Sequence, residues 1–203
     1  MNNHYIMLAA RAVSAIFRPI YFPLVGFILL FHLTFLSLFS IEYRLTLLAM
    51  VAVFTIVLPK IGVYMYRKLH GWRSHHLRHR ERRYVPYLLT ITSYLACVNV
   101  MQSYYVPRWL GGILVGALAT QIICSLINLR YKISMHCAGA GGACGMLAAY
   151  SVIFQFNAVW WLMFLILLSG MVGTARMLLR QHSLGEVVAG SVVGAVCCFF
   201  GVI

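Results

Sequence analysis

His182 and Glu186, near the C-terminal end of the chain, have the residue types and the spacing of a catalytic pair. Glu186 opens an apolar run that continues almost without polar residues to Ile203. A carboxylate at the edge of hydrocarbon is costly, so we expect it to bind His182, one helical turn earlier. A carboxylate bound to one imidazole nitrogen leaves the other nitrogen free as a base or nucleophile. The alternative is that both side chains only cap the last helix.

A second polar stretch, residues 130–136, places a cation, a hydroxyl and an imidazole close together as Lys132, Ser134 and His136. We expect a helix to begin here. Unpaired N–H groups and the helix dipole favour an anion at such a helix start. Small residues follow directly and allow another helix or a lipid headgroup to approach the backbone. This stretch therefore predicts an anion site.

A third polar stretch, residues 67–83, is rich in arginine. A basic run at a membrane edge is more often an anchor to the lipid surface than a site. Guanidinium groups nevertheless suit phosphate, because their planar forks donate two parallel hydrogen bonds. We expect one or two of the arginines at 78–83 to face inward.

Together the three stretches predict phosphoryl transfer without a metal ion. The cations would hold a phosphate dianion, one histidine would attack phosphorus, and the other would protonate the leaving oxygen. All three acidic residues are glutamates, and there is no aspartate, so no acidic cluster is available to bind Mg²⁺. We therefore expect a phosphohistidine intermediate and no metal or other cofactor.

These residues resemble the motifs of the type 2 phosphatidic acid phosphatase superfamily of membrane lipid phosphatases, and most closely a short bacterial branch. The third motif of that family is Ser-Arg, five residues, His, three residues, Asp. Here Arg176, His182 and Glu186 keep the spacing, with alanine in place of serine and glutamate in place of aspartate. The second motif is Pro-Ser-Gly-His, of which Ser134 and His136 remain.

The first motif of the family, Lys, six residues, Arg-Pro, has a poor match in residues 76–86. Tyr84 and Val85 separate Arg83 from Pro86, and His76 stands where the lysine would fall. The catalytic roles that the resemblance implies are nucleophile for His182, orienting carboxylate for Glu186 and general acid for His136. The phosphate-binding residues that it implies are Arg176, Ser134 and Arg83. We expect Lys132 to supply the cation that the first motif lacks.

The composition indicates that these residues are positioned by membrane-spanning helices. Hydrophobic residues make up 63% of the 203 positions, above the roughly 45–50% of a soluble domain. The net charge is +13, but the bases lie between long apolar runs, which favours anionic lipid over nucleic acid as the partner. The six cysteines lie in or beside apolar stretches without CxxC spacing, as packing residues do. These features exclude a soluble domain and a disordered tail.

We predict an all-α integral membrane protein, a polytopic helical bundle with seven transmembrane helices, or six if one run is re-entrant or interfacial. A helix needs about 20 apolar residues to cross a membrane. Such runs lie at 20–40, 45–66, 86–106, 109–129, 138–156, 158–175 and 184–203. Two GxxxG motifs that we interpret as packing motifs are Gly141–Gly145 and Gly190–Gly194. We expect residues 1–19 to form an interfacial segment, with Arg11 and Arg18 on one helix face, and residues 20–203 to form a single transmembrane domain.

Two predicted spans separate each polar stretch from the next, so all three stretches should lie on one side of the membrane. Fourteen of the sixteen bases fall on that side, and Arg44 and Arg108 fall on the other. The positive-inside rule predicts that the fourteen are cytoplasmic. The resemblance implies instead the periplasmic face of a bacterial inner membrane.

The substrate that the resemblance implies is a membrane lipid carrying a phosphate or pyrophosphate. Phosphatidic acid, phosphatidylglycerophosphate, undecaprenyl pyrophosphate and a lipid A phosphate all remain open. The alternative function is non-enzymatic binding or translocation of anionic lipids on the basic face, which does not need the spacing of Arg176, His182 and Glu186. A third alternative is haem held by membrane histidines, for which His32 has no clear partner at its depth.

Overall fold

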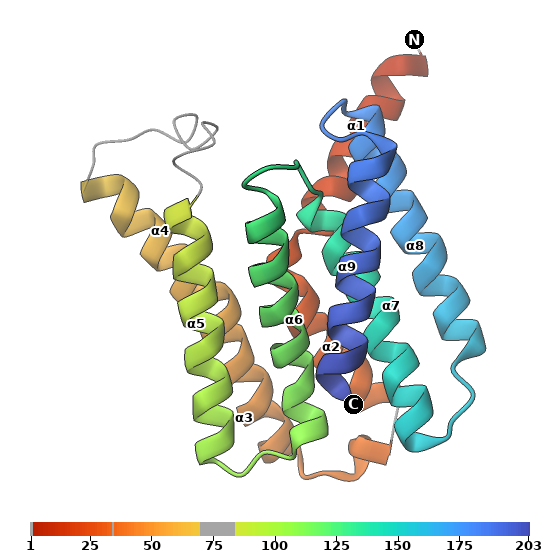
Figure 1. Ribbon diagram of the computed structural model, residues 1–203. Coiled ribbons are helices and arrows are strands. Elements are labelled where there is room, and N and C mark those ends of the chain that lie inside the picture. Colours follow the sequence, from red (N-terminus) through yellow and green to blue (C-terminus); the bar gives the residue numbers. More distant parts are fainter. Residues whose placement is uncertain (1, 34, 70–83) are drawn as a thin grey trace. The chain divides into compact units, whose positions relative to one another are not determined.

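The computed structural model describes residues 2–33, 35–69 and 84–203, and every regular element in these residues is helical (Figure 1). The elements are α1 (Asn2–Ile16), η1 (Pro19–Tyr21), α2 (Phe22–Leu33), η2 (Phe35–Leu38), α3 (Ile41–Ala52), η3 (Val53–Val57), α4 (Leu58–Leu69), α5 (Tyr84–Ser103), α6 (Arg108–Ile127), α7 (Met135–Phe154), α8 (Val159–Leu178) and α9 (Leu184–Val202). Arg83 and the other arginines of the 78–83 run lie outside the described residues.

Within the described residues, six segments are long and apolar enough to cross a membrane. They are Tyr5–His32, Ile41–Leu69, Arg108–Ile127, Met135–Phe154, Val159–Leu178 and Leu184–Val202. The predicted run 86–106 corresponds to α5, which is not among the six. The prediction of an all-α polytopic membrane protein is confirmed by the six candidate spans among the described residues, and the choice between six and seven crossings stays a prediction. The predicted division into residues 1–19 and 20–203 stays a prediction.

The described chain forms two compact units, one from residues 1–22 and 107–203 and the other from residues 23–106. In the second unit, α5 packs against α4 and against the η3 turn, a single turn of π-helix. In that turn the N–H of residue i+5 bonds the carbonyl of residue i, and Pro59 has no N–H to offer Phe54. The Ser93 hydroxyl donates to the Phe54 carbonyl instead. This hydrogen bond joins α5 to the preceding helix.

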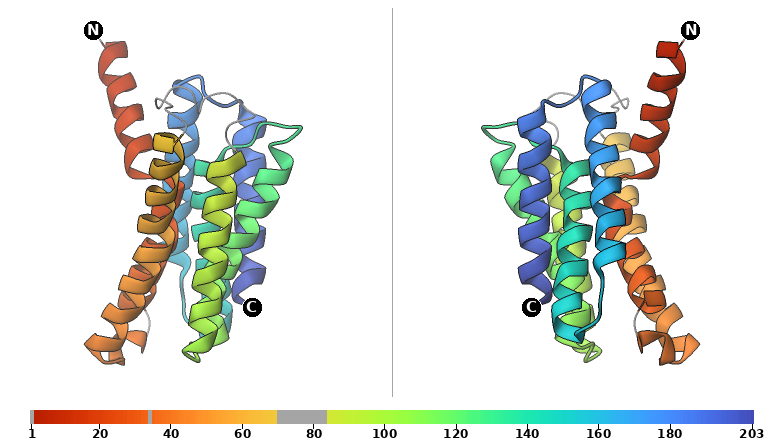
Figure 2. Two further views of the ribbon diagram at one scale, coloured as in Figure 1. Left: turned by 90° about the vertical axis from the view of Figure 1, so that its left-hand side faces the viewer. Right: turned by 90° about the vertical axis from the view of Figure 1, so that its right-hand side faces the viewer.

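The first unit is built on close contact between α7 and α9. A Cβ added to Gly145 would lie 2.0 Å from the carbonyl oxygen of Ala195, and one added to Gly194 would lie 1.9 Å from that of Ala138. Only glycine allows the two backbones to approach so closely. In the right-hand view of Figure 2, α7 lies between α8 and α9. The interpretation of the two GxxxG motifs as packing motifs is confirmed.

This contact brings the second and third polar stretches to one end of the first unit. The loop before α7 and the loop before α9 lie at that end (Figure 1), where Ser134 N donates to Glu186 O at 3.3 Å. Residues 130–136 and 176–186 thus lie at the same end of the helices, as the two predicted spans between them require. The described part of the 67–83 stretch, residues 67–69, belongs to the second unit.

Replacing Gly194 by alanine is expected to destabilise the protein by about 1–3 kcal/mol, because the methyl group overlaps the Ala138 carbonyl. The measurement is reversible unfolding in mixed micelles, followed by helical circular dichroism. The matched control is Gly170→Ala in α8, where a Cβ would meet no atom within 4 Å. Equal stability of the two variants would contradict the packing described here.

Candidate active site

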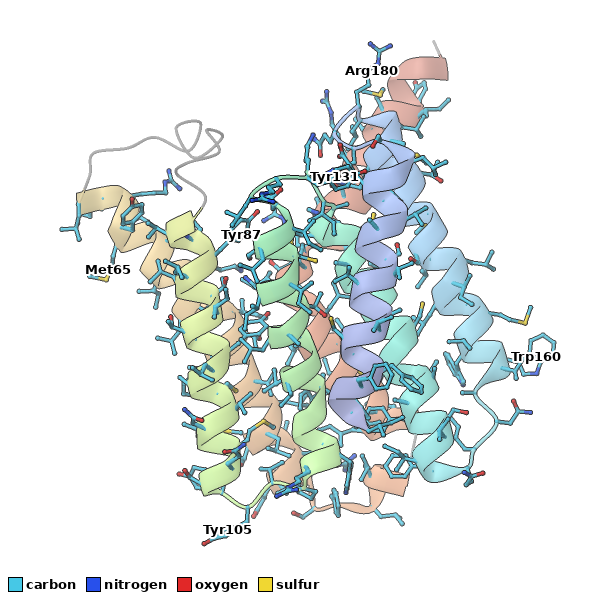
Figure 3. The ribbon with its side chains drawn as sticks, in the orientation of Figure 1. Met65, Tyr87, Tyr105, Tyr131, Trp160 and Arg180 are labelled. Atoms are coloured by element: carbon cyan, nitrogen blue, oxygen red, sulfur yellow. The ribbon has the colours of Figure 1, made fainter. Side chains whose placement is uncertain are left out.

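The end of α8 shapes the loop that carries His182. Arg180 N donates to Met177 O at 2.8 Å, and Gln181 N donates to Arg176 O at 3.1 Å. With Arg180 in the left-handed region at φ 51°, these bonds form a Schellman motif, a common way to end a helix. Figure 3 shows the Arg180 side chain extending away from the helix ends. The chain reverses here, and His182 follows two residues later.

Ser183 caps α9 and leaves Glu186 free for another partner. The Ser183 hydroxyl accepts a hydrogen bond from Glu186 N at 3.4 Å. In a capping box the glutamate three residues on would reach back to the N-cap N–H. The Glu186 carboxylate instead binds His182, with Oε2 2.6 Å from Nδ1. Capping is thus performed by Ser183, and the alternative in which Glu186 only caps the helix does not explain this bond.

The His182–Glu186 pair orients the imidazole. The two side chains are only 9% and 16% exposed, and His182 lies in the loop just before α9 rather than on the helix. When His182 is neutral, the carboxylate accepts the proton on Nδ1, which leaves the lone pair on Nε2. Burial lowers the pKa of His182 below its ordinary value. The hydrogen bond with Glu186 opposes this shift, whereas the charges of Arg176 and Lys132 add to it. A neutral, oriented imidazole at neutral pH is the result.

The loop before α7 packs against this pair. Lys132 Nζ donates to the Gln181 carbonyl at 2.5 Å, and its charge acts on both His182 and Glu186. Tyr131, labelled in Figure 3, lies over the first turn of α9, where a Cβ on Gly185 would be 3.0 Å from the tyrosine hydroxyl. Lys132 therefore lies beside the predicted catalytic pair, as expected for a cation of the site.

Ser134 lies at the base of the same loop, but its side chain is turned inward. It is fully buried, and its hydroxyl donates to Cys137 Sγ at 3.2 Å. Contact with a phosphate would require this hydroxyl to leave the cysteine. The phosphate-binding role of Ser134 stays a prediction, and the same holds for Arg83.

Arg176, in the last turn of α8, reaches the N-terminal helix. Its Nη1 donates to the Ser14 hydroxyl at 2.7 Å. Its Nε is buried and has no hydrogen-bond partner among the described residues. A buried unpaired donor on a cation carries a substantial desolvation cost, which an oxyanion would relieve. His136 interacts electrostatically with Arg176, His182 and Arg18, and the Ser14 backbone lies beside it.

The sequence predictions did not include a contribution of α1 to this site. Arg11 and Ser14 lie three residues apart on α1, and Arg18 follows just after the end of the helix at Ile16. The backbone of Arg18 is extended (ψ 139°), because the proline at position 19 disfavours helical backbone in the residue before it. Arg11, six residues, Arg18 and Pro19 reproduce the spacing Lys, six residues, Arg-Pro better than residues 76–86 do. The signal was present in the sequence, but a basic helix near the N-terminus is equally typical of a membrane-surface anchor.

Because burial lowers the pKa of His182, we expect NMR titration of the imidazole to give a value below 6.5. Between that value and 6.5 the unfolded chain binds the proton and the native chain does not, so stability should fall as the pH drops below 6.5. Glu186→Gln removes a group that favours the imidazolium and should lower the pKa further. A higher pKa in Glu186→Gln would contradict the pairing.

Comparison with known proteins adds no relative. No family model, no curated protein and no solved structure matches the chain. The likeness to the type 2 phosphatidic acid phosphatase superfamily is therefore one of motif residues and their spacing. The fold brings together His136, Arg176, His182 and Glu186, with Lys132 at their edge. Two imidazoles, a carboxylate and two cations at one end of apolar helices are the groups available for chemistry.

Proposed function

We propose that this protein is a metal-independent lipid phosphatase that hydrolyses a phosphomonoester or pyrophosphate of a membrane lipid through a phosphohistidine. The observation that carries the proposal is the 2.6 Å contact between His182 Nδ1 and Glu186 Oε2. It leaves Nε2 as the nucleophilic atom, in a loop at the end of apolar helices where a lipid headgroup would lie. We propose the bacterial inner membrane as its location, on the resemblance of its motifs.

In the first step, His182 Nε2 attacks phosphorus, and a nitrogen–phosphorus bond forms as the bond to the leaving oxygen breaks. That oxygen takes a proton from His136 and departs as the lipid alcohol or lipid phosphate. Glu186 stabilises the positive charge that develops on the His182 ring, because it already accepts the Nδ1 proton. The separate positions of the two histidines, one in a loop and one on α7, suit these opposite roles.

In the second step, water attacks the phosphohistidine. His136, now neutral, takes a proton from that water, and the nitrogen–phosphorus bond breaks to release inorganic phosphate. His182 returns to the neutral form with its proton on Nδ1. Both steps pass through a phosphoryl group whose oxygens carry negative charge, so cations that hold these oxygens lower both barriers.

Arg176 is the cation best supported for this task. Its unpaired Nε–H lies on a guanidinium already fixed at Nη1, so the group is oriented before a substrate arrives. Lys132, in the loop before α7, acts electrostatically on His182 and Glu186, and Arg18, just after α1, acts on His136. Three cations from three separate segments of the chain suit a phosphate dianion.

The second candidate function, anionic-lipid binding or translocation without turnover, has one observation in its favour. The lipid-accessible side of α1 exposes apolar residues next to Arg11 and Arg18, as a membrane-surface helix does: Tyr5, Ile6, Leu8 and Ile16. Such a function leaves the His182–Glu186 hydrogen bond without a role. Turnover separates the two candidates.

His182→Ala is expected to reduce phosphate release by about 10³-fold or more, because it removes the nucleophile. The measurement is phosphate release by the purified protein in detergent, with phosphatidic acid, phosphatidylglycerophosphate, undecaprenyl pyrophosphate and lipid A phosphate as substrates. His32→Ala, which removes a histidine whose ring bonds the Ile28 carbonyl of its own helix turn, is the matched control and should keep full activity. Full activity of His182→Ala, or binding of these lipids without turnover, would overturn the proposal.

Activity should survive excess EDTA unchanged, since the proposed steps use only side chains of the protein. In the part of the chain that the structure describes, no three His, Cys or acidic side chains are placed to hold a metal ion. The test is the rate of phosphate release before and after chelation. A loss of activity that Mg²⁺ restores would contradict a metal-independent mechanism.

A further inference from the structure

The N-terminal helix packs into the first unit. Ala10 is buried, and Val13 and Phe17 pack against the buried cluster of Cys137, Val172 and Val187. Ala10 and Val13 of α1 and Phe17, whose N–H bonds the Val13 carbonyl just past the end of the helix, recur at i, i+3 and i+7, the spacing of one helix face. Ser14 directly follows Val13, so the packing of this face sets where its hydroxyl lies.

The Ser14 side chain is hydrogen-bonded to one nitrogen of the Arg176 guanidinium. The hydroxyl accepts from Nη1, and the buried Nε has no partner among the described residues. In a guanidinium, Nε–H and one Nη2–H point to the same side and form a fork that can bind two oxygens of one phosphate. A bond at Nη1 holds the plane of the group without occupying that fork.

The backbone of the same residue lies beside the second histidine. The Ser14 backbone and Arg176 both act electrostatically on His136. One residue of α1 is therefore bonded to Arg176 and adjacent to the predicted general acid. A residue that served only to dock α1 on the membrane surface would need neither position.

We propose that Ser14 is a positioning residue: its hydroxyl fixes the Arg176 guanidinium so that the Nε edge faces the transferred phosphoryl group. This inference deepens the proposed function and rests on it for the identity of the anion. Ser14 itself does not contact the reacting atoms. Its effect on the reaction passes through Arg176, which distinguishes it from the cations of the site.

The activity test compares Ser14→Ala, Ser14→Thr and Ser191→Ala. Ser14→Ala should lower kcat/KM by about 10- to 100-fold, the value of a hydrogen bond to a charged group, and should weaken inhibition by orthovanadate by a similar factor. Ser14→Thr keeps the hydroxyl and should remain within about threefold of the wild type. Ser191→Ala removes a hydroxyl bonded to the Val187 carbonyl of its own helix and should leave kcat/KM and vanadate inhibition unchanged.

A second measurement does not depend on turnover. Thermal unfolding in detergent of Ser14→Ala, Arg176→Met and the double variant should show that the double variant loses less stability than the sum of the single losses. Additive losses would overturn the coupling of the two residues. Wild-type activity and vanadate inhibition in Ser14→Ala would overturn the positioning role, as would an equal loss in Ser14→Thr.

The two measurements separate the failure of this inference from the failure of the proposed function. If the wild-type protein releases phosphate from no lipid, the proposed function fails, and the inference that rests on it fails with it, even where the unfolding cycle shows coupling. If the wild type is active and Ser14→Ala is equally active, the function stands and the positioning role is overturned.

Discussion

The contact between the backbones of α7 and α9 is the interaction on which the rest of the first unit depends. Lipid tails are as apolar as the helices, so close packing has to supply much of the attraction that water supplies in a soluble protein. Glycines at 141, 145 and 194 let the two helices approach until a single methyl group would overlap a carbonyl of the other helix. The segments just before each helix are then held side by side, and Ser134 N bonds Glu186 O.

At this end of the unit, one carboxylate orients an imidazole on which two cations act. Glu186 lies in the first turn of α9, where the helix dipole favours a negative charge, and it binds the imidazole of His182. The cations Lys132 and Arg176 and the burial of the ring all favour neutral His182. In the proposed reaction the same surroundings would keep a nucleophile uncharged and place positive charge where a phosphate would bind. With only three acids in the chain, Glu186 is the acid that this arrangement requires.

The N-terminal helix joins two environments. One side packs through Val13 and Phe17 on the helices that hold the site, and another side exposes apolar residues such as Ile16. The polar side between them brings Ser14 to Arg176. An amphipathic helix near the N-terminus is usually interpreted as a membrane anchor, and the hydrogen bond between Arg176 and Ser14 shows a structural role as well. The anchoring role and the structural role both depend on apolar and polar residues that recur at helical spacing along α1.

The sequence by itself determined the all-α membrane class, because hydropathy over about 20 residues reports directly on spanning helices. It also indicated the His182–Glu186 pair, since a costly carboxylate at the membrane edge needs a partner and a histidine stands four residues before it, but the structure places His182 in the loop before α9. Only the tertiary structure decided that Ser14 meets Arg176, 162 residues away in the chain, and that the Ser134 hydroxyl turns toward Cys137. Such contacts depend on how helices pack and on which way side chains turn in the packed interior. Neither is encoded in the spacing of residues along one helix.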